Sequence, residues 1–182
     1  IITLLYDDSN GSLVWNNVFD GGVSGNDDAV GLVIVDNGNF LMIAGNCINS
    51  SGNYDIAAIN IKNDGGPNWS YYTDGTAGTN DNAKAIIATG ANVAICGMLD
   101  NNTTGKDYTT IVIDALSPTL IWQNNYDVSN GVQSATSLVN DSTGNIAVTG
   151  YAVNSGIYEY HTLLYTPAGT QIFTNIESTG IN

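Results

Sequence analysis

The sequence predicts an all-β fold, a β-propeller-like array of four-stranded antiparallel blades with three and a half blades in this chain. An aromatic residue recurs at intervals of 54, 53 and 51 residues, at Trp15, Trp69, Trp122 and Phe173. A glycine recurs at intervals of 52 and 53 residues, at Gly45, Gly97 and Gly150. Two landmarks with one period indicate an internal repeat. No apolar period of 3.6 residues persists over three turns, so we expect almost no helix.

Within each repeat the elements follow one order, clearest at residues 108–160. An apolar run (TIVI), a short turn (DALSP) and a second run ending in tryptophan (TLIW) predict a β-hairpin. A polar loop leads to a third strand (ATSLV), a tight turn (NDSTGN) and a fourth strand (IAVTG). We therefore expect each repeat to supply four short antiparallel strands.

The domain prediction is one repeat domain over residues 1–182, with repeats at about 1–54, 55–107 and 108–160 and a partial repeat at 161–182. About 50 residues and four strands are what a propeller blade requires. Blades bury both of their faces against neighbours, which would explain strands that are apolar throughout, such as GLVIV at residues 31–35.

The repeat resembles the SBBP β-propeller repeat, which is common in large secreted bacterial proteins. Its best match runs from Asp114 through Trp122 to Gly150, and the resemblance covers essentially the whole chain. It implies a blade architecture and a secreted or cell-surface location, but no activity. The chain departs from the pattern where Phe173 replaces tryptophan, where Pro118 replaces the turn glycine, and where TGAN at residues 89–92 lacks an acidic residue.

Three full repeats and a final hairpin give 14 strands, and both ends supply the first two strands of a repeat. Such a chain cannot close on itself in the usual way of propellers, whose smallest members have about four blades. Three explanations stay open: further blades of a longer chain, completion by other copies of the chain, and a non-propeller arrangement of the same hairpins. An open sheet edge would favour pairing with another chain, so we expect homo-oligomers or filaments.

The charge balance excludes several classes of partner. The formal net charge is −14, the chain has three lysines and no arginine, and only 11% of its residues are charged. Such a chain cannot neutralise phosphates, so nucleic acid is not an expected partner. No run of about 18 apolar residues occurs, so we expect no membrane insertion. The acidic, Asn- and Thr-rich composition fits a surface exposed outside the cell.

Acidic turns are the candidate cation sites, and calcium is the one cofactor that the sequence offers. The candidate ligands are Asp7, Asp8, Asp27, Asp28 and Asp141. None lies in an EF-hand loop, and Asp also favours turns for conformational reasons, which is the favoured explanation. Three sequons fall in the loops after the fourth strands, and their candidate glycosylation sites are Asn49, Asn101 and Asn102.

Two patterns associated with enzymes also have structural explanations. Asp7 and Asp114 each precede a tryptophan by eight residues, which is similar to the docking motif of quinoprotein propellers. KNDGGPNW, which begins at Lys62, is similar to the Asp-box of sialidase-like propellers. Both families implied by these motifs use arginine in their sites, and this chain has none. We therefore expect the tryptophans to pack between blades.

The single histidine and the two cysteines are also expected to be structural. His161 stands beside two tyrosines and has no Ser or Cys partner for nucleophilic catalysis. Cys47 and Cys96 occupy strand ends and are expected to be buried free thiols.

The function predicted from these observations is a non-catalytic secreted or cell-surface structural or binding module. It would complete its fold by self-association or by further blades. One alternative is a glycan-binding propeller, a lectin or adhesin whose exposed tyrosines line a carbohydrate site. The other alternative is a part of a larger propeller enzyme whose catalytic residues lie on other blades.

Overall fold

The computed structural model describes residues 1–128 and 131–178, and it confirms the all-β prediction. The strands form four antiparallel sheets, one of two strands and three of four strands. The hairpin sheet is β1 (Ile2–Tyr6) and β2 (Leu13–Val18). The first sheet is β3 (Asp28–Val35), β4 (Phe40–Ile48), β5 (Tyr54–Lys62) and β6 (Pro67–Thr73). The second sheet is β7 (Asn82–Thr89), β8 (Asn92–Asn101), β9 (Gly105–Asp114) and β10 (Leu120–Tyr126). The third sheet is β11 (Gln133–Asn140), β12 (Ile146–Asn154), β13 (Ile157–Tyr165) and β14 (Gln171–Ser178).

Hydrogen bonding between strands does not follow the repeat boundaries expected from the sequence. Each four-stranded sheet joins the last two strands of one repeat to the first two strands of the next, in the order β3-β4-β5-β6 and its equivalents. The cause is loop length, because β8 pairs with β9 from Asn92 to Asn101 across a tight turn, whereas the longer loop after β10 leads to the next sheet. The final hairpin, β13–β14, therefore belongs to a four-stranded sheet, and among the described strands only β1–β2 forms a sheet of two.

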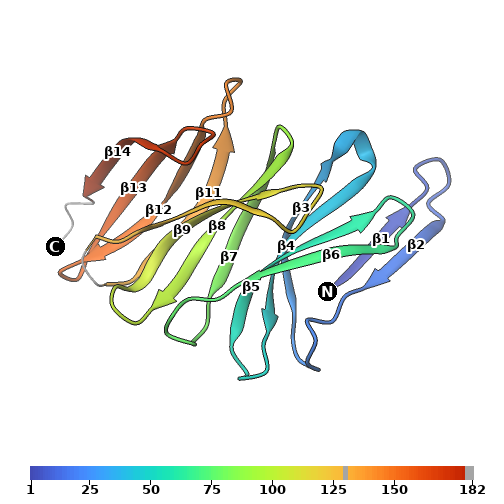
Figure 1. The fold of residues 1–182 in the computed structure, drawn as a ribbon, viewed down its shortest axis with the longest axis horizontal. Helices are drawn as coiled ribbons and strands as arrows, with labels where there is room; N and C mark the ends of the chain where they lie inside the picture. Colours follow the sequence, from blue (N-terminus) through green and yellow to red (C-terminus); the bar gives the residue numbers. More distant parts are fainter. Residues whose placement is uncertain (129–130, 179–182) are drawn as a thin grey trace.

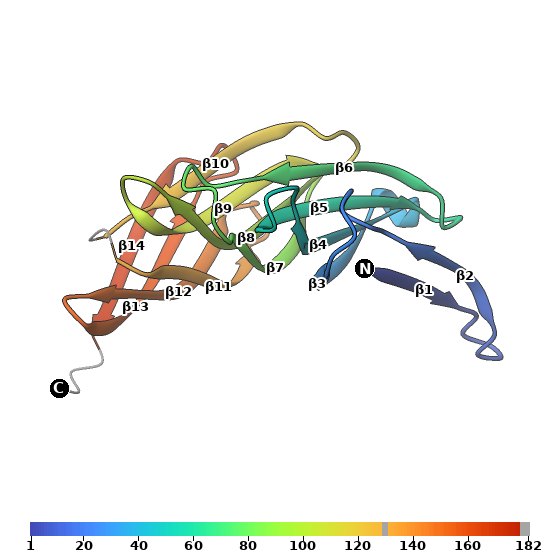
Figure 2. The ribbon, with the colours of Figure 1, turned by 90° about the horizontal axis from the view of Figure 1, so that it is seen from below.

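The four sheets stack face to face along the chain (Figure 1). One apolar core lies between the hairpin sheet and the first sheet, a second between the first and second sheets, and a third between the second and third. Strands β3, β7 and β11 are edge strands of their sheets, and β7 contacts both β3 and β11, on the inner side of the stack in Figure 2. Figure 2 shows that the stack curves into an arch, with the hairpin sheet at one end and the third sheet at the other. No sheet in the described residues closes on itself.

Neighbouring residues of one strand serve different cores, which explains the continuous apolar runs. In β9, Ile111 belongs to the core shared with the first sheet, and the adjacent Val112 belongs to the core shared with the third sheet. Both are essentially inaccessible, at 0% and 1% exposed. Successive side chains of a strand point to opposite faces, so a sheet buried on both faces needs apolar residues at every position.

The periodic glycines allow close approach of two strands at a bulge. Gly45, Gly97 and Gly150 pair with an alanine of the preceding strand, and each pairing lies beside an irregularity in the register. A Cβ atom at Gly97 would lie 2.0 Å from the carbonyl oxygen of Asn82, and one at Gly150 would lie 2.1 Å from that of Ser134. Any side chain at these positions would therefore force the strands apart.

The hairpin sheet covers only part of the first sheet, because it has two strands instead of four. Leu32 and Ile34 of β3 lie on the face that the hairpin only partly covers, and they are 47% and 64% exposed. The equivalent position to Leu32 in the third sheet, Leu138, is 4% exposed. A cavity of about 380 Å³ separates residues 1–4 from β3, with Leu32 and Ile43 among its lining residues.

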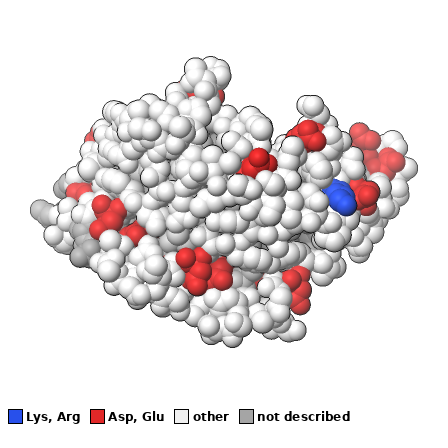
Figure 3. Space-filling view, viewed as in Figure 1, with Lys and Arg blue, Asp and Glu red and all other residues white. Residues whose placement is uncertain are grey.

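Acidic side chains are spread over the visible face in Figure 3 in several small groups, and a basic side chain appears beside one of them. Across residues 1–128 and 131–178, no helix has the length and apolar character needed to cross a membrane.

Candidate functional site

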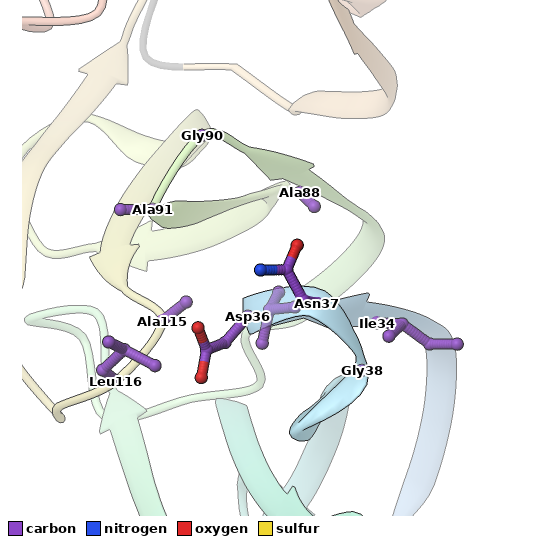
Figure 4. A pocket seen from close by; sticks show the side chains of 10 residues that line it. Ile34, Asp36, Asn37, Gly38, Ala88, Gly90, Ala91, Ala115 and Leu116 are labelled. Atoms are coloured by element: carbon purple, nitrogen blue, oxygen red, sulfur yellow. The ribbon is translucent and has the colours of Figure 1, made fainter.

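A cavity of about 720 Å³ lies between the first and second sheets at one end of the stack. It is bounded by the short helix η1 (Asp36–Gly38), the β7–β8 turn at Gly90, and the β9–β10 turn at Leu116. Asp36 and Asn37 project into this space, whereas Ile34 points away from it (Figure 4). Asp36 is the only ionisable residue among the lining residues. The cavity therefore offers a carboxylate and an amide for binding, and no acid–base pair or nucleophile.

Two aspartates fix the loops that cross from one sheet to the next. Asp27 accepts hydrogen bonds from the main-chain nitrogens of Gly21 (2.8 Å) and Ile48 (3.1 Å). Asp81 accepts equivalent bonds from Gly75 (2.6 Å) and Asp100 (2.7 Å). Both carboxylate oxygens of Asp27, a predicted calcium ligand, thus accept hydrogen bonds from the protein's own backbone.

The third loop of this kind carries an amide instead of a carboxylate. Gln133 accepts a bond from the main-chain nitrogen of Val128 (3.1 Å) and donates its own NH₂ to Asp127 (2.7 Å). Its position relative to the bulged alanine, two residues later, is that of Asp81. At the equivalent place between the first two sheets the side chains are all carboxylates. Gln133 therefore replaces one of these charges with an uncharged amide.

An acidic cluster forms at that position. The carboxylate oxygens of Asp55, Asp74 and Asp81 lie within 4.8 Å of one another, and no other acidic group of three was found in the described residues. Burial, together with the charges of Asp74 and Asp55, raises the pKa of Asp81 to about 6, although the backbone hydrogen bonds from Asp100 and Gly75 act to lower it. Because the oxygens of Asp81 already accept two backbone hydrogen bonds, the cluster alone specifies no cation.

The other predicted calcium ligands lie apart from this cluster, in turns at strand ends. Asp7 accepts bonds from the main-chain and hydroxyl groups of Ser9, which lower its pKa. Asp141 is bonded by Thr143 and Asn145, and these bonds lower its pKa to about 2. Asp8 and Asp28 are exposed. The structure brings none of the five together with the other acidic groups, and calcium binding stays a prediction.

The asparagines predicted as glycosylation sites take part in turn hydrogen bonds. The side-chain nitrogen of Asn49 donates to Asp55 (2.8 Å), and that of Asn101 donates to Asp107 (2.7 Å). Asn102 donates to the main-chain oxygen of Thr76. A glycan on any of these nitrogens would replace one N–H that the turn uses.

His161 is buried between the second and third sheets, as expected of a packing residue. It has no exposed surface. Its Nδ1 lies 3.2 Å from the hydroxyl oxygen of Tyr126, and its Nε2 lies 3.3 Å from a carboxylate oxygen of Glu159. This arrangement satisfies both ring nitrogens inside the protein but offers no access to a substrate.

Both cysteines are free and buried, as expected, and burial raises the pKa of each thiol to about 12.

Two of the periodic tryptophans, Trp122 and Trp15, attach their sheet to the hairpin turn of the next. The indole nitrogen of Trp122 donates to the main-chain oxygen of Pro167 (2.9 Å), and its ring lies 5.5 Å from that of Tyr165. Asn124, two residues later, donates to the main-chain oxygen of Gly169 (2.8 Å). A Cβ atom at Gly169 would lie 2.7 Å from the indole ring, so the turn needs a glycine there.

Trp15 repeats this contact two cores earlier. Its indole nitrogen donates to the main-chain oxygen of Asn63 (2.9 Å), and Asn17 donates to that of Gly65 (2.9 Å). Sequence reasoning identified the tryptophans but missed the asparagine two residues later. That residue recurs after Phe173 as Asn175, so a signal was present.

The remaining two aromatic positions differ from this pattern. Trp69 is partly buried against the second core, and its indole nitrogen has no hydrogen-bond partner. The turn oxygen equivalent to that of Pro167 belongs to Ala115, and it accepts a bond from Asn60 instead (2.9 Å). Phe173 lies on the outer face of the third sheet and is 52% exposed.

No protein-family model matches the chain, and no curated protein resembles it significantly in sequence. The similarity to the SBBP repeat therefore stays a prediction, and function must be argued from the surfaces of the chain itself.

Proposed function

We propose that the chain is a non-catalytic structural module, secreted or at the cell surface, whose propeller-like blades associate with further copies through the two open faces of the stack. The observation that carries the proposal is a contrast between repeats. Ile2, Leu4 and Tyr6 on the outer face of the hairpin sheet are 67%, 47% and 54% exposed. Leu163 and Tyr165, the counterparts of Leu4 and Tyr6 in the third sheet, are 0% and 1% exposed.

The opposite end of the stack supports the same proposal. Val139, Leu164 and Phe173 lie in one row across the outer face of the third sheet. The equivalent row of the second sheet includes Ala94 and Val112, which are 0% and 1% exposed because the third sheet covers them. Burying such rows provides most of the favourable free energy of stacking, so two exposed rows favour association.

The test is the mass of the chain in solution, measured by light scattering over a range of concentrations. The proposal expects species larger than the 19.1 kDa chain, with a mass that rises with concentration. A mass that stays at the chain value up to millimolar concentration would refute self-association.

A carbohydrate-binding role is the second candidate, on the basis of exposed tyrosines of the third sheet. The rings of Tyr151 and Tyr158 lie 5.6 Å apart, and Tyr158 and Tyr160 are 59% and 62% exposed. Exposed aromatic rings with neighbouring amides suit sugar stacking. Glycan-array binding that is lost on Tyr160→Ala would support this role, and an array without signal would exclude it for the glycans presented.

A further inference from the structure

The two open faces of the stack carry the two halves of the contact that joins the sheets internally. At two of the three sheet interfaces within the chain, an aromatic residue of one sheet packs on the turn of the next hairpin, and an asparagine two residues later donates to the main-chain oxygen of the turn glycine. The contact thus has a donor half, the aromatic and the asparagine, and an acceptor half, the turn.

The donor half is open on the third sheet. Phe173 pairs with Leu164 in the register that Trp122 has with Val112. Asn175 follows Phe173 by two residues, as Asn124 follows Trp122. Within residues 1–128 and 131–178, the side-chain nitrogen of Asn175 donates one hydrogen bond, to the neighbouring carboxylate of Glu177 at 3.2 Å.

The acceptor half is open on the hairpin sheet. In the β1–β2 turn the main-chain nitrogen of Gly11 donates to the oxygen of Asp7 (2.8 Å); this turn is one residue longer than the β13–β14 turn, where Gly169 donates to Thr166 (2.9 Å). Gly11 has a φ angle of +73°, close to the +82° of Gly169. A Cβ atom at Gly11 would meet nothing within 4 Å, whereas one at Gly169 would meet an indole ring.

The strand that precedes the turn matches as well. Residues 3–6 and 162–165 share the sequence TLLY. Tyr165, in the second of these segments, packs against Trp122, whereas Tyr6, in the first segment, is 54% exposed. The hairpin sheet therefore has an exposed surface, around Tyr6, that is equivalent to the surface around Tyr165 on the third sheet. Trp122 covers the surface on the third sheet.

We propose that Phe173 of one copy packs on Tyr6 and Gly11 of a second copy, with Asn175 donating to the main-chain oxygen of that Gly11. This inference rests on the proposed self-association and adds its polarity. Each copy has one donor face and one acceptor turn, so the contact is head-to-tail, and it repeats until the assembly closes or forms a filament. Phenylalanine lacks the indole N–H, so the bond that Trp122 makes to a turn oxygen has no equivalent here.

The experiment blocks each half separately. Phe173→Asp places a charge on the donor face, and Gly11→Asn fills the acceptor turn with a residue that tolerates positive φ. Tyr6→Asp is a second acceptor variant that leaves the turn unchanged. Ile172→Asp is the donor control, because Ile172 is 53% exposed and its equivalent Ile121 stays 46% exposed beside a covered face. Gly52→Asn is the acceptor control, since Gly52 has a φ of +84° and open space.

Light scattering should show that both blocked variants associate at least about tenfold more weakly than the unmodified chain and the controls. An equimolar mixture of Phe173→Asp and Gly11→Asn should form a dimer and nothing larger, because each variant retains the half that the other has lost. Circular dichroism verifies that each variant is folded.

Three results would overturn the inference. Association of the blocked variants that equals that of the controls, or a mixture that forms no dimer, would refute the head-to-tail contact while self-association stands. A chain that stays monomeric would refute both proposals together.

Discussion

The contact between Trp122 and the β13–β14 turn makes a quantitative prediction for Gly169→Ala. Alanine in the left-handed region costs about 1–2 kcal/mol relative to glycine. The new Cβ atom would also lie 2.7 Å from the indole ring, closer than any van der Waals contact. The ring cannot move towards Tyr165, whose ring lies 5.5 Å away, so it must move out of the turn.

Moving the ring adds two further free-energy costs to the conformational cost of alanine at a positive φ. Overpacking of a filled site costs roughly 1–3 kcal/mol. Losing the 2.9 Å bond to Pro167 costs about 0.5–1.5 kcal/mol. We therefore expect Gly169→Ala to lower the free energy of unfolding by roughly 2.5–6.5 kcal/mol.

Gly52→Ala isolates the conformational term. Gly52 has a φ of +84°, and a Cβ atom there would meet nothing within 4 Å. Its substitution should cost only about 1–2 kcal/mol. Equilibrium urea unfolding, followed by circular dichroism and tryptophan fluorescence, measures both values. Equal destabilisation by the two variants, within about 0.5 kcal/mol, would show that the tryptophan contact does not hold the sheets together.

Three further predictions concern the acidic cluster, the repeated TLLY segments and the thiols. Because the pKa of Asp81 is raised from 3.8 to about 6, the folded state binds this proton more tightly than the unfolded chain. The stability that Asp81 contributes is therefore complete below about pH 4 and is lost as the pH rises through 6. Asp81→Gln, which introduces the amide found in the third loop, should remove this loss of stability. Thermal unfolding of the unmodified and variant proteins from pH 4 to 8 measures the difference. Melting temperatures that change in parallel with pH would contradict the assignment to Asp81. Leu163→Ala should destabilise the chain by about 2–5 kcal/mol, whereas Leu4→Ala, at a position 47% exposed, should cost under about 1 kcal/mol in dilute solution, where urea titration compares them. Both cysteines should resist a thiol reagent at pH 8 in the folded protein and react fully in urea, because the thiolate is scarce and buried; fast labelling without urea would contradict their burial.

The strands and turns were predictable from the sequence because they depend on local patterns. Alternation, turn residues and the periodic tryptophans act within about ten residues. The choice of pairing partners could not be predicted, because the sequence does not show whether a strand pairs across its preceding or its following loop. Asn101 and Gly105 pair across a turn that the sequence suggested to be a longer connection.

The acidic cluster was missed for a related reason. Asp55, Asp74 and Asp81 come from a strand start and from both ends of a crossover loop, and only the stacking of two sheets brings them together. The predicted calcium ligands were instead chosen for adjacency in sequence. Adjacent residues in an extended segment point in opposite directions, and Asp27, just before β3, is turned to the backbone of Gly21 and Ile48 while Asp28 is exposed, so adjacency is a poor guide to a shared site.

The offset between repeats and sheets has a consequence for how such a chain changes length. Each repeat gives two strands to one sheet and two strands to the next, so every boundary between repeats falls inside a hydrogen-bonded sheet. Duplication or deletion of one whole period restores the same strand order at the junction. Loss of half a period would instead join mismatched edges. Evolution can therefore lengthen or shorten this protein in steps of about 53 residues, and the genetic breakpoint need not coincide with the edge of a structural unit.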